Sequence, residues 1–390
     1  CIQDGTDLNF TRHPMTEGLG ILGRNQTGAP SLGLHVHSTL AVSDSGLPLG
    51  VLNTRFEAPT DKRGQGRGAP EARKSRYWLE ALADCRDVAR ELPGTTRLVS
   101  VMDREADFFS LYAAQRDHCA VDVLVRAKSD RHLLQWDEDS GRFVRSGHKL
   151  FEALRAQRAG GHMKLSVARA SVRPKLSGRP AHPGRKARTA KMALSWRQVT
   201  IGSTLKEHAG QEPVTLWVVH AREQSPPAGA KRLEWCLLTS VAIEDASQAE
   251  EVLRWYCLRW RIEDWHRVLK TGCRVDELGH HHAERLARAI SIRMVIAWRI
   301  MLMTLLGRES PDLPPALLFT DVELKVLRRY AMKRKGAEIQ TLRDAVTWTA
   351  ILGGYQNRKH DPPPGADLTW YGRMKLAAMC ELVELYDLEE

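Results

Sequence analysis

The alternation of apolar and polar positions near the N-terminus predicts a β-hairpin. Leu34 to Val42 alternates in the manner of a half-buried strand, and Val51 to Phe56 continues the pattern after a turn rich in Gly and Pro. A helical apolar spacing follows between Arg76 and Leu92. These elements place regular, core-forming structure in the first quarter of the chain.

A strand–helix–strand pattern comes next. The apolar run Arg97 to Met102 predicts a buried strand, a helix is expected from Asp103 to about Arg116, and Val121 to Arg126 predicts another strand. This spacing is typical of an α/β domain with parallel strand pairing.

The pattern changes between Arg155 and Arg197, where twelve residues are Lys or Arg and none is acidic. Short apolar segments flank this stretch at Met163–Val167 and Pro213–Val219, so we predict a β-rich insertion with a basic loop. The alternative is a disordered, solvated loop. Contact with DNA is favoured because charge of one sign over such a length repels itself without a polyanion. The candidate contacts are Arg173, Lys175, Arg179, Arg185, Lys186 and Arg188.

Helical periodicity dominates the C-terminal part. One long helix is predicted from Asp245 to Lys270 and a second from about Ala283 to Leu306, and residues 307–390 are helical with Pro-rich breaks. Near the end, Trp370, Leu376, Met379, Val383 and Tyr386 form an apolar stripe at helical spacing. Such a stripe either packs on its own chain or pairs two protomers.

Composition narrows the class of protein. The 390 residues carry a formal net charge of +11 and a pI near 9.4, which favours a nucleic acid partner over a merely soluble basic protein. The seven cysteines lack a CxxC spacing, which indicates free thiols in a reducing cytoplasm. We find no apolar run of about 18 residues, so no membrane span is expected.

The predicted helix around Glu263 gathers polar groups on one face. At about 100° per residue, Tyr256, Arg259, Glu263 and Lys270 share an arc roughly 60° wide, opposite an apolar face. Arg259 and Glu263 have the spacing of an ordinary salt bridge within a helix. That interpretation leaves Tyr256 and Lys270 on the same arc unexplained.

Two aspartates follow predicted strands. Asp4 comes after a short apolar segment and Asp103 ends the run Leu-Val-Ser-Val-Met. Taken singly, Asp103 is as well explained as a helix cap and Asp4 as a turn residue. Together with Glu263, they form a set of three carboxylates on core elements, which suits Mg²⁺ and its preference for oxygen ligands. Two such ions about 4 Å apart can activate a nucleophile and stabilise the leaving oxygen of a phosphodiester.

The spacing Tyr256-x₂-Arg259-x₃-Glu263-x₆-Lys270 resembles the YREK signature of DDE transposases of the insertion-sequence-four family. The segments Cys1-Ile-Gln-Asp4 and Asp103-Arg-Glu-Ala-Asp resemble its two aspartate motifs, and Leu233 to Ser240 resembles the segment before the YREK helix. The resemblance covers nearly the whole chain. It implies an α/β fold with an RNase H-like mixed sheet, a β-rich insertion and a helical C-terminal region.

The resemblance also implies roles for individual residues. Asp4, Asp103 and Glu263 would be the catalytic, metal-binding triad for Mg²⁺, with Mn²⁺ as a substitute. The residues expected at DNA are Tyr256, Arg259 and Lys270 on a phosphate, Trp235 stacked on a base drawn out of the duplex, and Arg126 and Arg267. The expected partners are transposon-end DNA, target DNA and a second protomer in a paired-end complex, in a bacterial cytoplasm beside the nucleoid.

The expected domains follow from these elements. Residues 1–127 and 250–308 form the catalytic core, 128–249 the insertion and 309–390 the dimerisation region. The first catalytic strand begins at residue 1, without the N-terminal DNA-binding domain usual in the family, so recognition of a specific end sequence is not expected of this chain alone. Two rival functions are an RNase H-like nuclease that does not join DNA and a catalytically inactive DNA-binding protein.

Overall fold

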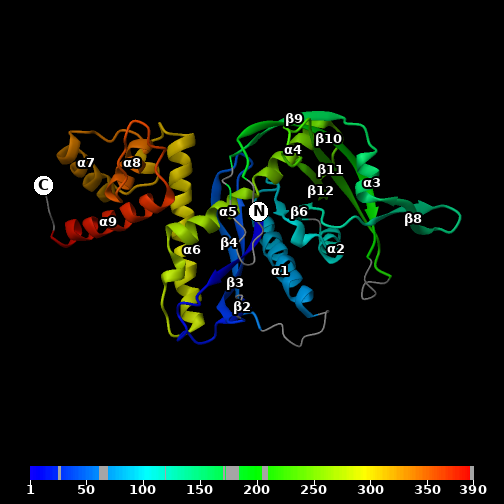
Figure 1. Ribbon diagram of the computed structural model, residues 1–390, viewed down its shortest axis with the longest axis horizontal. Helices are drawn as coiled ribbons and strands as arrows, with labels where there is room; N and C mark the ends of the chain where they lie inside the picture. The colour runs from blue at the N-terminus through cyan, green and yellow to red at the C-terminus, as the bar shows by residue number, and fades with distance from the viewer. Residues whose placement is uncertain are drawn as a thin grey trace.

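One mixed β-sheet runs through most of the molecule (Figure 1). The structure is a computed structural model that describes residues 1–24, 28–60, 69–118, 120–169, 172, 184–203 and 210–386. Within these ranges the sheet has twelve strands, in the order β2-β3-β1-β5-β6-β12-β11-β10-β7-β8, with β4 beside β3 and β9 beside β10.

The N-terminal strands form one half of the sheet. β1 lies antiparallel to β3 and parallel to β5, and β5 is parallel to β6. The predicted hairpin is confirmed as β3 and β4, and the predicted parallel pair as β5 and β6. The bounds are β1 (Ile2–Asn9), β2 (Gly20–Arg24), β3 (Pro30–Val42), β4 (Pro48–Glu57), β5 (Val99–Met102) and β6 (Asp122–Arg126).

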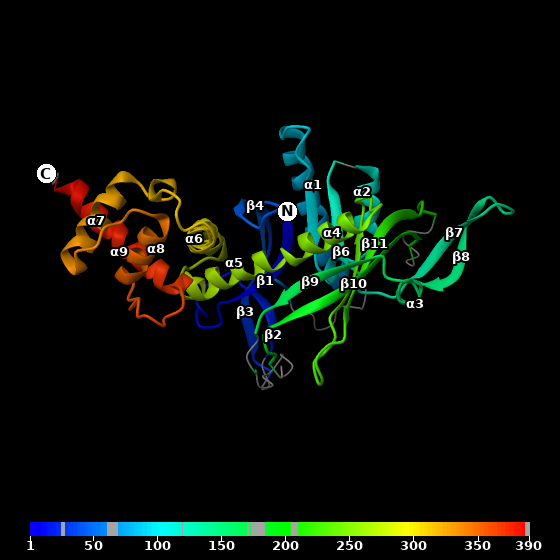
Figure 2. The same cartoon turned by 90° about the horizontal axis from the view of Figure 1, so that it is seen from above.

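The strands of residues 128–249 extend this same sheet. β12 pairs antiparallel with β6 on one side and with β11 on the other, so the strands of residues 128–249 are hydrogen-bonded directly to the N-terminal strands. The β7–β8 hairpin projects away from the body in both views (Figures 1 and 2). The bounds are β7 (His132–Asp137), β8 (Arg142–Lys149), β9 (Gly161–Val167), β10 (Arg188–Ile201), β11 (Val214–Gln224) and β12 (Glu234–Thr239).

Helices cover both faces of the sheet. Along β6, Val123 and Val125 belong to the core that contains α1 and α2, whereas Leu124 between them belongs to the core that contains α4, α5 and α6. A third core lies among α7, α8 and α9, on the other side of α6 from the sheet (Figure 1). The helices are α1 (Ala69–Glu91), α2 (Phe109–Asp117), α3 (Leu150–Arg155), α4 (Ala246–Cys257), α5 (Trp260–Arg267), α6 (Ala283–Glu309), α7 (Asp321–Lys335), α8 (Leu342–Leu352) and α9 (Ala366–Leu385).

Two predicted helices are divided in the structure. The helix expected from Asp103 is a 3₁₀ turn, η1 (Arg104–Ala106), followed by α2. The helix expected from Asp245 to Lys270 consists of α4, α5 and a π-helical turn, η3 (Val268–Gly272). The amides of Arg259, Arg261 and Ile262 bond to carbonyls three residues back, which tightens the turn between α4 and α5. The remaining short turns are η4 (Val275–Glu277) and η5 (Pro315–Leu317).

The helix α6 is long and apolar enough to cross a membrane when judged by length and composition alone. It contacts β4, α5, α8 and α9 and contributes Leu286, Ile290 and Ala297 to the core. These contacts account for its apolar character as that of a helix between two packed parts of the protein.

Candidate active site

The two aspartates of the predicted triad lie on neighbouring parallel strands, Asp4 within β1 and Asp103 directly after β5, so the interpretation of Asp4 as a turn residue is wrong. Ile2 of β1 is in register with Val101 of β5, and Asp4 and Asp103 each come two residues later along these strands. Asp103 also caps η1, because its Oδ1 accepts a hydrogen bond from the Glu105 amide at 2.7 Å. The capping and site interpretations therefore hold together for the same residue.

Glu263 reaches the site from α5 through Arg259. The guanidinium of Arg259 donates to Glu263 Oε1 and lies with Nη1 3.6 Å from Asp4 Oδ2. The Arg259 side chain is 10 % exposed, so this bridge between two carboxylates is largely shielded from water. The salt bridge considered from the sequence is present, and it joins the two ends of the triad.

The charges of Asp103 and Glu263 both influence Asp4. Burial raises the pKa of Asp4 to about 7, the nearby Arg259 opposes this rise, and the charges of Asp103 and Glu263 add to it. Burial is the main cause of the raised pKa, and it disfavours the charged form of Asp4.

Lys270 contacts β1, and Tyr256 contacts β12. Lys270 lies on the π-turn η3, and its Nζ donates to Thr6 Oγ1 on β1 at 2.6 Å. Tyr256 is buried, with its ring 5.9 Å from that of Trp235, and burial raises its pKa. The residues predicted to bind a phosphate thus surround the triad, and Arg259 and Lys270 both have partners within the protein.

The other two predicted DNA contacts differ in position. Arg126, at the end of β6, lines a cavity of about 190 Å³ and lies close enough to Tyr256 to lower its pKa. Arg267 is 69 % exposed and pairs with Asp264 on the surface of α5. Arg126 therefore belongs to the neighbourhood of the triad, whereas Arg267 interacts with none of the three carboxylates in the contacts of the described residues.

Several residues of the site were missed in the sequence. Thr6 shares a face of β1 with Asp4, and the alternation of side chains along a strand was a sufficient signal for it. The cavity beside Arg126 also contains Arg104, next to Asp103, and Lys128, two residues after Arg126. Their closeness in sequence to predicted residues would have identified them.

The basic loop is only partly described. Arg173, Lys175 and Arg179 lie outside the described residues. Arg188 forms two hydrogen bonds, each of 2.9 Å, to the Glu223 carboxylate, so its charge is neutralised within the sheet. Arg185 donates to the Ala168 carbonyl and is exposed with Lys186. Among the three candidates within the described residues, Arg188 is therefore the one whose charge is paired with a carboxylate.

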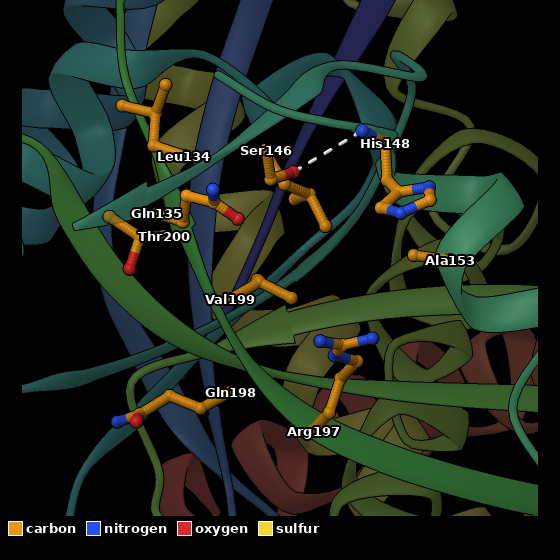
Figure 3. A pocket seen from close by; sticks show the side chains of 10 residues that line it. Leu134, Gln135, Ser146, His148, Ala153, Arg197, Gln198, Val199 and Thr200 are labelled. Carbon is orange, nitrogen blue, oxygen red and sulfur yellow. Dashed lines mark hydrogen bonds between the residues drawn. The ribbon is translucent and has the colours of Figure 1, made fainter. Parts of the chain in front are cut away.

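A second cavity lies within residues 128–249. It has a volume of about 230 Å³ between the β7–β8 hairpin and β10, with the Arg197, Gln135 and His148 side chains on its wall (Figure 3). The Ser146 hydroxyl accepts a hydrogen bond from the His148 amide at 3.4 Å there. None of the predicted site residues lines this cavity.

The triad fits a hard divalent cation in its chemistry. The carboxylates of Asp4, Asp103 and Glu263 are suitable oxygen donors for such an ion. Within the described ranges, no group of three or more His, Cys, Asp or Glu side chains is arranged to hold a metal ion. In this structure the Arg259 guanidinium interacts with both Asp4 and Glu263, two of the three residues that would hold such an ion.

Comparison with known families gives two matches that overlap at residues 295–299. Residues 57–299, more than half of the chain, match a family model described as a transposase DDE domain. Residues 295–386 match a model described as the dimerisation domain of the Tn5 transposase. The first match includes Asp103, Glu263 and the whole YREK segment, and the second extends from α6 through α9.

Proposed function

Because the chain belongs to the family of DDE transposases and is related to the Tn5 transposase, we propose that it moves a DNA element by metal-dependent cut-and-paste transposition. The observation that supports the proposal is the Arg259 guanidinium, which binds Glu263 of α5 and lies 3.6 Å from Asp4 of β1, beside the strand β5 that Asp103 follows. DNA transposition is the function of the family. The cut-and-paste route and the use of a divalent metal ion are our proposal.

In this proposal, Asp4, Asp103 and Glu263 hold Mg²⁺, for which Mn²⁺ substitutes. The bound cation supplies charge that activates a nucleophile and stabilises the leaving oxygen. The chain itself orients the phosphodiester: Arg259 offers two N–H donors to a phosphate and Lys270 a single point charge, with Tyr256 as a hydrogen-bond donor. Because Arg259 and Lys270 bind Asp4, Glu263 and Thr6 here, DNA must replace these partners.

The proposed reaction consists of successive phosphoryl transfers. Water attacks a phosphorus at the element end, and the P–O3′ bond breaks to release a 3′-OH. This 3′-OH attacks the opposite strand, which yields a hairpin and frees the flanking DNA, and a second water opens the hairpin. The 3′-OH then attacks target DNA. The hairpin step rests on the resemblance to the Tn5 transposase, with Trp235 as the surface on which a displaced base stacks.

The proposed partners are transposon-end DNA, target DNA and a second protomer that brings two ends together. The exposed apolar side chains Leu382, Leu385 and Tyr386 at the end of α9 support the second protomer. Trp370 and Leu376 of the predicted stripe pack within their own chain instead.

A strand-transfer assay tests the proposal. A pre-cut transposon end is incubated with the protein, supercoiled target DNA and Mg²⁺, and joined products are counted. A transposase joins the end to the target, a simple nuclease only nicks the target, and an inactive DNA-binding protein only shifts the end on a native gel. Nicking without joining, or binding alone, would refute the proposal. Asp103→Ala serves as the control that abolishes joining in an active transposase.

A further inference from the structure

The buried carboxylate of Asp107 joins two parts of the chain. Asp107 lies four residues after Asp103, and its side chain is 0 % exposed. Its Oδ2 accepts the backbone amides of Lys128 at 2.7 Å and Ser129 at 3.1 Å. Its Oδ1 accepts from the Tyr112 hydroxyl at 2.8 Å and forms an ion pair with Arg131. Asp107 therefore fastens the segment after β6 to the turn that carries Asp103.

The segment so fastened carries positive charge toward the site. Arg126 and Lys128 line the cavity of about 190 Å³ together with Arg104, which follows Asp103 directly, and Arg155 of α3. Arg126 influences the pKa of Tyr256, so this cavity adjoins the YREK residues. Glu234 also lines the cavity and pairs with Arg155 at 3.1 Å, so Arg104, Arg126 and Lys128 are the side chains that suit an anionic DNA backbone.

The contacts of Asp107 separate it from the residues that meet DNA. A side chain without exposed surface cannot touch DNA, and backbone amides bonded to a carboxylate fix the path of a loop more than its composition does. Arg131, which is 11 % exposed, packs its guanidinium 5.8 Å from the Tyr112 ring and completes the network. The loop that leads from Arg126 to Arg131 is thus held at both its middle and its end.

We propose that Asp107 is a positioning residue for DNA binding, which sets Arg126 and Lys128 beside the second catalytic aspartate. The proposal rests on the proposed function, because the ligand of the cavity is the phosphate backbone of the DNA to be cut. In Asp107→Asn one of the two oxygens becomes an NH₂ group, so either the Lys128 and Ser129 amides or the Tyr112 hydroxyl lose their acceptor, and Arg131 loses its counter-charge. Lys128 and Arg126 then no longer share one fixed arrangement.

The test compares Asp107→Asn with Asp122→Asn. Asp122 is a matched control, since it lies at the other end of β6 and is likewise held by Arg97 and the Ser240 hydroxyl, each at 2.7 Å. For both variants, melting temperature, the Kd for a duplex end and its salt dependence, and single-turnover cleavage at saturating DNA are measured. Asp107→Asn is expected to weaken binding about ten-fold and to reduce the salt slope by about one, with cleavage at saturation nearly unchanged.

The control decides between positioning and simple stabilisation. Asp122→Asn is expected to lower the melting temperature and leave the Kd unchanged. If Asp107→Asn also lowers only the melting temperature, the inference is wrong. If Asp107→Asn does not fold, Ser129→Pro removes one amide donor from the exposed side of the network, and unchanged DNA binding by that variant overturns the inference. Wild-type protein that neither binds nor cuts DNA refutes the proposed function itself, independently of both variants.

Discussion

Arg259 holds together carboxylates that otherwise repel one another. It lies between Asp4 and Glu263 and is almost fully buried, whereas the Glu263 side chain is 41 % exposed. A divalent cation bound by the triad would neutralise the same two carboxylates. At the scale of single residues, Arg259 and a bound metal ion would therefore neutralise the same negative charges.

Replacing Arg259 should destabilise the metal-free protein in particular. We expect Arg259→Ala to lower the free energy of unfolding by about 2 kcal/mol without metal, less than the roughly 3–5 kcal/mol for breaking a fully buried pair, because Glu263 is partly solvated. Urea unfolding with and without Mg²⁺ measures this, and Mg²⁺ should reduce the deficit. Arg267→Ala, which removes an exposed pair, is the control and should have little effect. An equal deficit in both conditions would mean that Arg259 and the metal do not neutralise the same charges.

Two buried histidines predict how stability depends on pH. Burial lowers the pKa of His37 to about 3, with His35 and Arg55 contributing, and burial lowers that of His266 to about 3, with Lys270 and His37 contributing. Between pH 6.5 and 3 the unfolded chain binds protons that the folded chain does not, so stability falls as the pH decreases. Each histidine should cost about 1.4 kcal/mol per pH unit in this range.

His266→Leu isolates one of these contributions. The His266 Nε2 is buried without a hydrogen-bond partner in the described structure, so leucine replaces it with little polar loss. Urea unfolding between pH 6 and 4 should show a slope smaller by about 1.4 kcal/mol per pH unit than that of the wild type. A slope equal to the wild type would show that His266 is already protonated in the folded protein.

The sequence predicted which residues gather at the site better than it predicted their partners. Asp4 and Glu263 lie on core elements and Asp103 directly follows one, and such positions are visible in a local pattern. Arg259 and Glu263 have a spacing that fits both a salt bridge and a shared phosphate contact, so spacing alone could not assign the partner. The role of Asp107 depends on amides more than twenty residues away, which no local pattern contains.

At the scale of elements, α8 and α9 cross with their backbones in close contact. A Cβ on Gly372 would lie 1.7 Å from the Thr349 carbonyl oxygen, and one on Gly353 would lie 1.9 Å from that of Leu368. The colliding atoms belong to the backbone, so a rotamer change cannot relieve the overlap. The two glycines therefore set the distance between these helices.

Gly372→Ala should force the two helices apart. We expect a loss of about 1–3 kcal/mol in the stability of the C-terminal helices, as for an overpacked core. Thermal unfolding and native gels with transposon-end DNA measure it, and paired-end complexes should decrease more than single-end binding. Gly365→Ala is the matched control, because a Cβ at Gly365 meets nothing within 4 Å. A normal yield of paired ends from Gly372→Ala would show that helix separation does not matter for pairing.

The division of the predicted YREK helix into α4, α5 and η3 could not be predicted from the pattern of apolar and polar residues. Leu258 and Arg259 keep right-handed helical dihedral angles, and the segment contains no Gly or Pro at the tightened turn. A change from α-helical to tighter and then to π-helical hydrogen bonding alters the rotation per residue without any change of composition. Ile262, Trp265 and Leu269 are buried as the predicted apolar face requires, but Tyr256 from the predicted polar arc lies in the same core, and the breaks were not predicted.

At the scale of the whole molecule, the C-terminal lobe exposes apolar side chains away from the N-terminal strands. Leu382 is 53 % and Leu385 77 % exposed, while Leu376 on the same helix is fully buried. Removal of all residues after Pro364 would open the core that contains Leu376 and Cys380. Point changes at the exposed end of α9 are the cleaner test of pairing.

Leu382→Glu combined with Leu385→Glu should leave a folded monomer that binds single ends and cannot pair them. Charge placed at an apolar contact between protomers opposes association because it must lose its water. Native gels with end DNA and the melting temperature measure the two properties. Met15→Glu, at an exposed apolar residue outside the C-terminal lobe, is the control. Normal paired-end complexes from the double variant would place the contact between protomers elsewhere.

The position of β12 between β6 and β11 has a consequence for the order of folding. Val125 of β6 pairs with Leu238 of β12 across more than a hundred residues, whereas Ile201 and Val214 join β10 and β11 across a short connection. Closing the longer loop costs more chain entropy, so the β10–β11 ladder should form first and the two halves of the sheet should join late. In pulse-labelled hydrogen exchange during refolding, the β6–β12 amides should gain protection after those of β10–β11. Simultaneous protection would indicate instead that the N-terminal strands and the strands of residues 128–249 fold as a single cooperative unit.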